Sequence, residues 1–68
     1  MEEVEIWVVR DKDSSLWMFF KKPDKDTDEG VWSVSGPYYP VVRLSEDNFP
    51  SVKWENENPT KAKIILEL

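Results

Sequence analysis

The apolar positions of this chain fall in short runs that are separated by polar turn residues. No segment repeats apolar residues at helical spacing over three turns, and the runs are rich in β-branched and aromatic residues, which favours strands over helices. The predicted strands cover residues 3–10, 16–22, 31–35, 38–44 and 60–68. Pro40 limits the start of the fourth strand to a sheet edge or a bulge, because proline donates no ladder hydrogen bond.

The first two runs predict a β-hairpin with two apolar faces. Residues 11–15 are polar and form its turn, since Asp and Ser side chains bind nearby backbone amides. A five-residue turn pairs residues whose numbers sum to 26: Trp7 with Phe19, Val9 with Trp17, Glu5 with Lys21, Ile6 with Phe20 and Val8 with Met18. An antiparallel sheet commonly keeps one face polar. We therefore expect this sheet to curl into a barrel, to be covered, or to meet another molecule.

The remaining segments complete a small all-β domain. Residues 24–30 are expected to be a charged loop, and Ser45 is a good N-cap for one short helical turn near residues 45–49. In the last run the residues expected on the inner face are Ala62, Ile64, Leu66 and Leu68. We predict an all-β fold of about five strands in one domain over residues 1–68, as an antiparallel meander or a small SH3-like barrel. The first and last strands are expected to be central in the sheet.

The composition is rich in aromatic residues and poor in catalytic ones. The chain of 68 residues has four tryptophans, three phenylalanines and two tyrosines, but no histidine and no cysteine. The commonest general base, the thiol nucleophile and the usual transition-metal ligands are therefore missing. The serines have no histidine to activate them, and two glycines do not make a phosphate-binding loop. We predict that the protein is not an enzyme and uses no cofactor.

One acidic segment, residues 24–30, carries a weak match to a calcium-binding loop. Asp24, Asp26 and Asp28 alternate as oxygen ligands do in EF-hand loops. Glu29 stands where the loop glycine belongs, Ser35 replaces the bidentate glutamate, and no helix flanks the segment. A solvated hairpin loop explains these residues better, so we predict no metal site.

The charge of the chain bears on its partners and its compartment. The formal net charge of −5 comes mostly from residues 1–30, and it repels nucleic-acid phosphate. Glu2 and Glu3 directly follow Met1, unlike the basic and then apolar start of a secretory signal. No apolar stretch approaches the roughly 20 residues that span a membrane. Because a chain without cysteine fits a reducing compartment, we predict a cytoplasmic location and no membrane contact.

Three segments resemble a group of short uncharacterised proteins that are often carried on phage or other mobile elements. The matching stretches are Ile6-Trp7-Val8-Val9-Arg10-Asp11-Lys12-Asp13, the Leu16 to Pro23 segment, and Phe49-Pro50-Ser51-Val52-Lys53-Trp54-Glu55 continuing to Pro59 and the final strand. Such relatives often have glycine where Ser14 stands. The resemblance implies a small β-rich cytoplasmic domain, an accessory or host-interaction factor, and brings no catalytic residue or ligand.

The surplus of aromatic residues predicts a protein–protein interaction or self-association module, with a homodimer as one form. Aromatic patches are where interface energy concentrates. The predicted interaction surface consists of Trp7, Trp17, Phe19, Lys21, Lys22, Trp32, Tyr38 and Tyr39.

Two alternatives remain open from the sequence. The patch of Trp17, Phe19, Lys21 and Lys22 is a candidate for binding single-stranded nucleic acid by base stacking, although a basic footprint is missing. The acidic first half also permits a decoy that occupies the DNA-binding groove of another protein.

Overall fold

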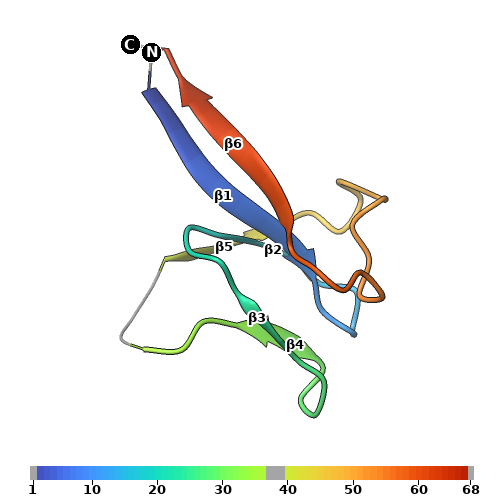
Figure 1. Cartoon of the computed structure of the whole chain (residues 1–68). Helices are drawn as coiled ribbons and strands as arrows, with labels where there is room; N and C mark the ends of the chain where they lie inside the picture. The colour runs from blue at the N-terminus through green and yellow to red at the C-terminus, as the bar shows by residue number, and fades with distance from the viewer. Residues whose placement is uncertain (1, 37–39, 68) are drawn as a thin grey trace.

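The computed structural model describes residues 2–36 and 40–67, which form six strands and no helix (Figure 1). The strands are β1 (Glu2–Arg10), β2 (Leu16–Phe19), β3 (Asp24–Asp26), β4 (Val31–Ser33), β5 (Val41–Leu44) and β6 (Thr60–Leu66). All strand pairs are antiparallel. The predicted all-β class is confirmed.

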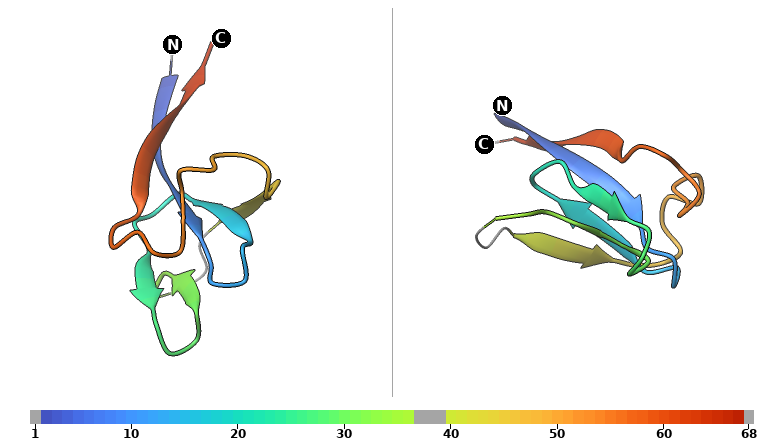
Figure 2. Two further views of the ribbon diagram at one scale, coloured as in Figure 1. Left: turned by 90° about the vertical axis from the view of Figure 1, so that its right-hand side faces the viewer. Right: turned by 60° about the horizontal axis from the view of Figure 1, so that its bottom comes forward.

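The strands form a four-stranded sheet in the order β5-β2-β1-β6 and a separate two-stranded sheet of β3 and β4. This order is not that of a meander, because β5 pairs with β2 and β6 pairs with β1. The first strand is central, as expected. The expectation that the last strand is central is wrong: β6 lies at one edge of the four-stranded sheet, and the two sheets lie in different layers (Figure 2).

The predicted register of the first hairpin is confirmed for residues 7–9. β2 ends at Phe19, so the ladder does not extend to the predicted pairs of Glu5 with Lys21 and Ile6 with Phe20. Trp7 pairs with Phe19, Val8 with Met18 and Val9 with Trp17, across a turn of residues 11–15. Ser14 holds a φ of 80°, in the left-handed region that glycine adopts without strain. The tight turn therefore forms although serine stands there.

Both faces of this hairpin are covered within the single chain. Side chains alternate across a strand, so Ile6 and Val8 point to one face and Val9 to the other. On the first face Ile6, Val8 and Leu16 form a core with Val52, which comes from the segment between β5 and β6. On the second face the core consists of Val9, Phe19 and Trp32, with Trp17, Val34 and Trp54 packed against it. The β3–β4 hairpin thus supplies the cover that the sequence required.

Several local predictions need correction. The segment expected as a charged loop begins with β3, which pairs with β4. Near residues 45–49 a single bond from Asn48 N–H to Ser45 O closes a turn, and the described residues there form no helix. β5 begins at Val41. Tyr38, Tyr39 and Leu68 lie outside the described residues.

Candidate interaction surface

The two halves of β1 have different neighbours. Residues 7–10 pair with β2, whereas residues 2–8 pair with β6. Among the described strands, residues 2–6 therefore have a partner on one side only, and with residues 62–66 of β6 they form a two-stranded ribbon. This β1–β6 ribbon runs diagonally away from the β2 and β5 strands and carries both ends of the chain (Figure 1).

The ribbon carries exposed apolar side chains near its outer end. Ile65 is 55% exposed and Leu66 is 47% exposed, and they point to opposite faces. Among the described residues no strand pairs with the outer edge of β6, so the backbone groups on that edge have no ladder partner. Edge strands of this kind are templates for pairing with another chain.

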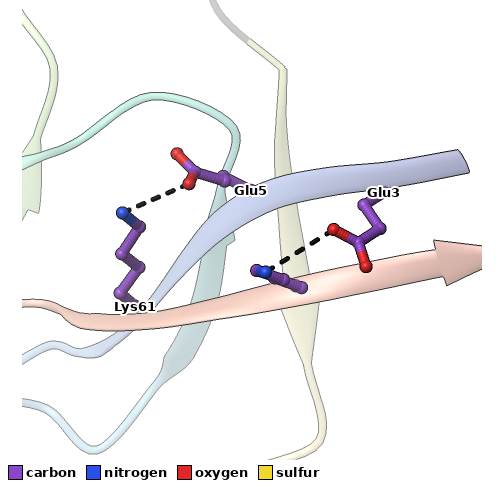
Figure 3. Close-up of polar contacts among 4 residues, drawn as sticks. Glu3, Glu5 and Lys61 are labelled. Carbon is purple, nitrogen blue, oxygen red and sulfur yellow. Dashed lines mark ion pairs between the residues drawn. The ribbon is translucent and has the colours of Figure 1, made fainter.

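Two ion pairs lie on one face of the ribbon (Figure 3). Lys61 Nζ is 3.2 Å from Glu5 Oε1, and Lys63 Nζ is 3.5 Å from Glu3 Oε2. All four side chains are more than half exposed, so each pair contributes only about 0.2–1 kcal/mol to stability. Their main consequence is geometric: both lysines reach across toward β1 and away from the outer edge of β6.

The structure places the predicted interaction residues in three different environments. Phe19 and Trp32 are buried, with 6% and 5% of their surface exposed, so the monomer does not offer them to a partner. Trp32 lies on β4 and packs against Phe19 of β2, so the β3–β4 hairpin covers this part of the four-stranded sheet. Burial of these aromatic side chains removes a large apolar area from water. Trp7 and Trp17 are half-buried, and Lys21 and Lys22 are exposed. The nucleic-acid patch therefore loses Phe19 as a stacking ring.

Trp17 is held in place by polar contacts at the hairpin turn. Its indole N–H donates to Ser15 Oγ at 3.0 Å, and the Arg43 guanidinium lies 5.5 Å from the centre of its ring. The Ser15 hydroxyl in turn lies 2.5 Å from Asp13 Oδ1, which also accepts the Ser15 N–H. These two hydrogen bonds lower the pKa of Asp13. The Trp17 ring is therefore held by the hydrogen bond to Ser15, and the Arg43 guanidinium lies over its face.

Asp11 joins the hairpin turn to the second sheet. Its Oδ1 accepts the backbone N–H of Trp32 at 2.9 Å, and its Oδ2 lies 3.4 Å from the Ser15 hydroxyl. Burial raises the pKa of Asp11, reinforced by repulsion from Asp13 and opposed by the Trp32 and Ser15 hydrogen bonds. The Asp11 carboxyl therefore connects the hairpin turn to the second sheet.

Arg10 organises the segment that follows β5, a role that no pattern in the sequence predicts. The guanidinium donates to the backbone carbonyls of Ser14, Glu46, Asn48, Phe49 and Val52 at 2.7–3.4 Å. Four of these acceptors are 36 to 42 residues away in sequence. Main-chain acceptors leave no trace in a side-chain pattern. Arg10 thereby positions Val52 over the first face of the sheet.

Lys25 performs a similar role on the other side. Its ammonium donates to the carbonyls of Trp54 and Asn56 and lies 4.3 Å from the centre of the Trp54 ring. Trp54 and Trp32 meet edge to face, with ring centres 6.5 Å apart. Contacts between a cation and an aromatic face contribute about 0.5–2 kcal/mol. Lys25 thus fastens the β3–β4 hairpin to the segment before β6.

The described residues offer no group of three or more potential metal ligands. In the acidic segment Asp26 Oδ1 accepts the backbone N–H groups of Asp28 and Glu29, so this carboxylate closes a turn. The described chain also contains no helix long and apolar enough to span a bilayer.

Comparison with protein-family models, curated proteins and solved structures yields no match. The resemblance to proteins of mobile elements therefore stays a prediction.

Proposed function

We propose that this chain is a non-enzymatic protein–protein interaction module that binds through the β1–β6 ribbon. The observation that carries this proposal is the outer edge of β6. This seven-residue strand pairs with β1 on one side, and on its other side it has no partner among the described strands. The exposed side chains of Ile65 and Leu66 lie beside that edge. A partner strand can add to such an edge with its own backbone hydrogen bonds.

The devices that usually protect an edge strand are weak here. Proteins block edges with proline, bulges, very short strands or lysines that point outward. β6 contains no proline and pairs with β1 without a bulge over seven consecutive positions. Lys61 and Lys63 reach toward β1, where Glu5 and Glu3 hold them. The edge is therefore open to a second strand.

The hairpin faces do not supply the contact surface. The sequence suggested them because they are apolar on both sides, and the chain itself covers both. The ribbon leaves two large apolar side chains exposed, those of Ile65 and Leu66. They adjoin backbone groups that have no strand partner among the described residues. This combination favours strand addition over the packing of two flat aromatic surfaces.

Affinity capture with matched variants tests the proposal. The bait is the wild-type chain, the double variant Ile65→Lys/Leu66→Lys, or the control Phe49→Lys, which charges an apolar residue that is 51% exposed outside the ribbon. Lysate is treated with nuclease, and light scattering of each pure protein reports self-association. We expect wild type and Phe49→Lys to capture the same proteins or to self-associate to the same extent. The ribbon variant, Ile65→Lys/Leu66→Lys, should lose these contacts. A monomer in every case, with captured proteins identical across the three baits, contradicts the proposal.

A further inference from the structure

We propose that the partner of the β6 edge is a second copy of this chain, paired antiparallel about a two-fold axis through Ile64. This inference rests on the proposed function and names the occupant of its contact surface. Pairing of two β6 edges joins two four-stranded sheets into one sheet of eight strands. The argument follows from symmetry and from the order of charges along β6.

Symmetry restricts the registers that two copies of β6 can adopt. A two-fold axis that relates neighbouring antiparallel strands stands perpendicular to the sheet, so residues opposite each other share a face. Because faces alternate along a strand, the numbers of two opposed residues must sum to an even value. Each allowed register is therefore centred on one residue, which faces its own copy.

Like charges exclude the registers centred near the start of the strand. A centre at Lys61 or Lys63 places that lysine opposite itself, and a centre at Ala62 places Lys61 opposite Lys63. Like charges directly opposite each other destabilise a sheet. A centre at Thr60 avoids this conflict but places Pro59, which donates no ladder hydrogen bond, opposite Lys61. Among the registers centred on residues 61–66, the first free of the conflict is centred on Ile64.

The register centred on Ile64 is complementary along its whole length. Lys61, whose ammonium contacts Glu5 in the single chain, lies opposite Glu67 of the second copy, so in the dimer its charge lies between two carboxylates, and the two-fold axis repeats this arrangement. On the face that holds the first core, Ala62 lies opposite Leu66 and Ile64 opposite Ile64. Lys63 lies opposite Ile65, so the apolar stem of the lysine and the exposed side chain of Ile65 cover each other. A register centred on Ile65 pairs Lys63 with Glu67 and, within the described residues, spans 63–67 instead of 61–67.

The size of this contact predicts a weak dimer. Strand addition over residues 61–67 lies at the small end of specific interfaces, below roughly 1,200 Å² of buried surface. Cross-strand pairs contribute only about 0.2–1 kcal/mol each. We therefore expect a dimer whose population depends on concentration in the micromolar range or above.

Engineered cysteines test the register directly, since the chain has none of its own. Lys61→Cys and Glu67→Cys are made as separate proteins at exposed positions and mixed in equal amounts with oxidised glutathione. Opposed residues have Cβ atoms about 4.5–5.5 Å apart, close to disulfide geometry. Each variant alone places its two cysteines about 20 Å apart, because they are six residues out of register. We expect a mixed disulfide at least tenfold faster in the mixture than in either protein alone.

One control mixture, together with the capture assay, separates the possible outcomes. A mixture of Lys63→Cys with Glu67→Cys matches the register centred on Ile65, and faster crosslinking there overturns the register proposed here. Equally slow crosslinking in all samples overturns self-pairing. If the ribbon variant nevertheless loses captured proteins, the proposed function stands with a different partner; if capture is also unchanged, both proposals fall.

Charge reversal provides a test without oxidation. Glu67→Lys creates two lysine pairs across the two-fold axis, whereas Glu57→Lys makes the same charge change in the segment before β6. In sedimentation velocity we expect Glu67→Lys to weaken dimerisation at least tenfold and Glu57→Lys to leave it within twofold. Equal dissociation constants for these two variants contradict the proposed pairing of Lys61 with Glu67.

Discussion

The two halves of β1 show how one strand can be an interior element and a free surface element. Residues 7–10 lie between β2 and β6 for part of their length and are covered on both faces, with Val9 only 1% exposed. Residues 2–6 pair with β6 alone, and the apolar side chains beside them remain partly open to water. The difference arises from coverage. Trp32 of the β3–β4 hairpin packs against Val9, and Val52 covers Val8 and Ile6, whereas residues 2–5 include no buried side chain.

The largest expected contrast between these regions comes from matched truncations. Leu16→Ala removes a fully buried side chain and leaves a cavity, so we expect a loss of about 2–5 kcal/mol in the free energy of unfolding. Ile65→Ala removes an exposed side chain and should change it by less than about 0.5 kcal/mol. Urea denaturation followed by tryptophan fluorescence measures both. Similar losses for the two variants would mean that the ribbon is as closely packed as the core.

Removal of the Arg10 guanidinium is expected to have the next largest effect. Arg10→Ala leaves five backbone carbonyls without their donor and releases the segment that carries Val52. We expect a loss of about 2–4 kcal/mol, since hydrogen bonds to charged groups contribute about 1.5–3 kcal/mol each and part of this group is hydrated. Arg10→Lys keeps the charge but not the fork of donors, and should recover less than half of the loss. Full recovery with lysine would contradict the assigned geometry.

Asp11 tests the connection between the two layers. Asp11→Ala leaves the Trp32 N–H unpaired and should cost about 1–3 kcal/mol. Asp11→Asn keeps an acceptor for this donor and should be close to neutral at pH 7, because it removes a charge that burial disfavours. Equal losses for alanine and asparagine would show that the charge, and not the hydrogen bond, is what the site requires.

The two neighbouring carboxyls predict opposite pH dependences. The raised pKa of Asp11 means that the folded state keeps a proton that the unfolded state has lost, so stability falls as pH rises from the ordinary value through the raised one. The lowered pKa of Asp13 means that stability falls as pH drops through the lowered value. Melting temperatures from pH 2.5 to 7 should therefore lose the first fall in Asp11→Asn and the second in Asp13→Asn. Unchanged profiles in these variants contradict the assignments.

A modest gain in stability is expected at the hairpin turn. Ser14 has a φ of 80°, which costs a residue with a Cβ about 1–2 kcal/mol. Ser14→Gly removes this strain but raises the entropy of the unfolded chain, so we expect a net gain of about 0.5–1 kcal/mol in stability. Ser14→Ala retains the strain and serves as the control. A destabilised glycine variant would show that the serine side chain contributes more than its backbone costs.

The sequence was most informative where structure depends on near neighbours. The first hairpin and its register follow from alternation in residues 3–10 and 16–22 and from a turn of fixed length. β3 was missed because its three residues, Asp24, Lys25 and Asp26, carry no apolar period and become a strand only through pairing with β4.

The candidate surface was harder to predict because it depends on which strands remain without a neighbour. The edge position of β6 is a property of the whole sheet and leaves no mark in its own residues. Phe19 and Trp32 are aromatic, as many interface residues are, but the packing of the β3–β4 hairpin on the β1–β2 hairpin buries both. Arg10 and Lys25 bind backbone carbonyls that are distant in sequence, so no side-chain pattern predicts their partners.

Amide hydrogen exchange at two protein concentrations tests the central distinction between the covered hairpin and the open edge most directly. In dilute solution we expect strong protection for the hydrogen-bonded amides of residues 7–10 and 16–19, and rapid exchange for the alternate amides of β6 that face away from β1. At high concentration those β6 amides should gain protection while the hairpin amides change little. Uniform protection along β6 in dilute solution, or rapid exchange within the hairpin, would contradict the account.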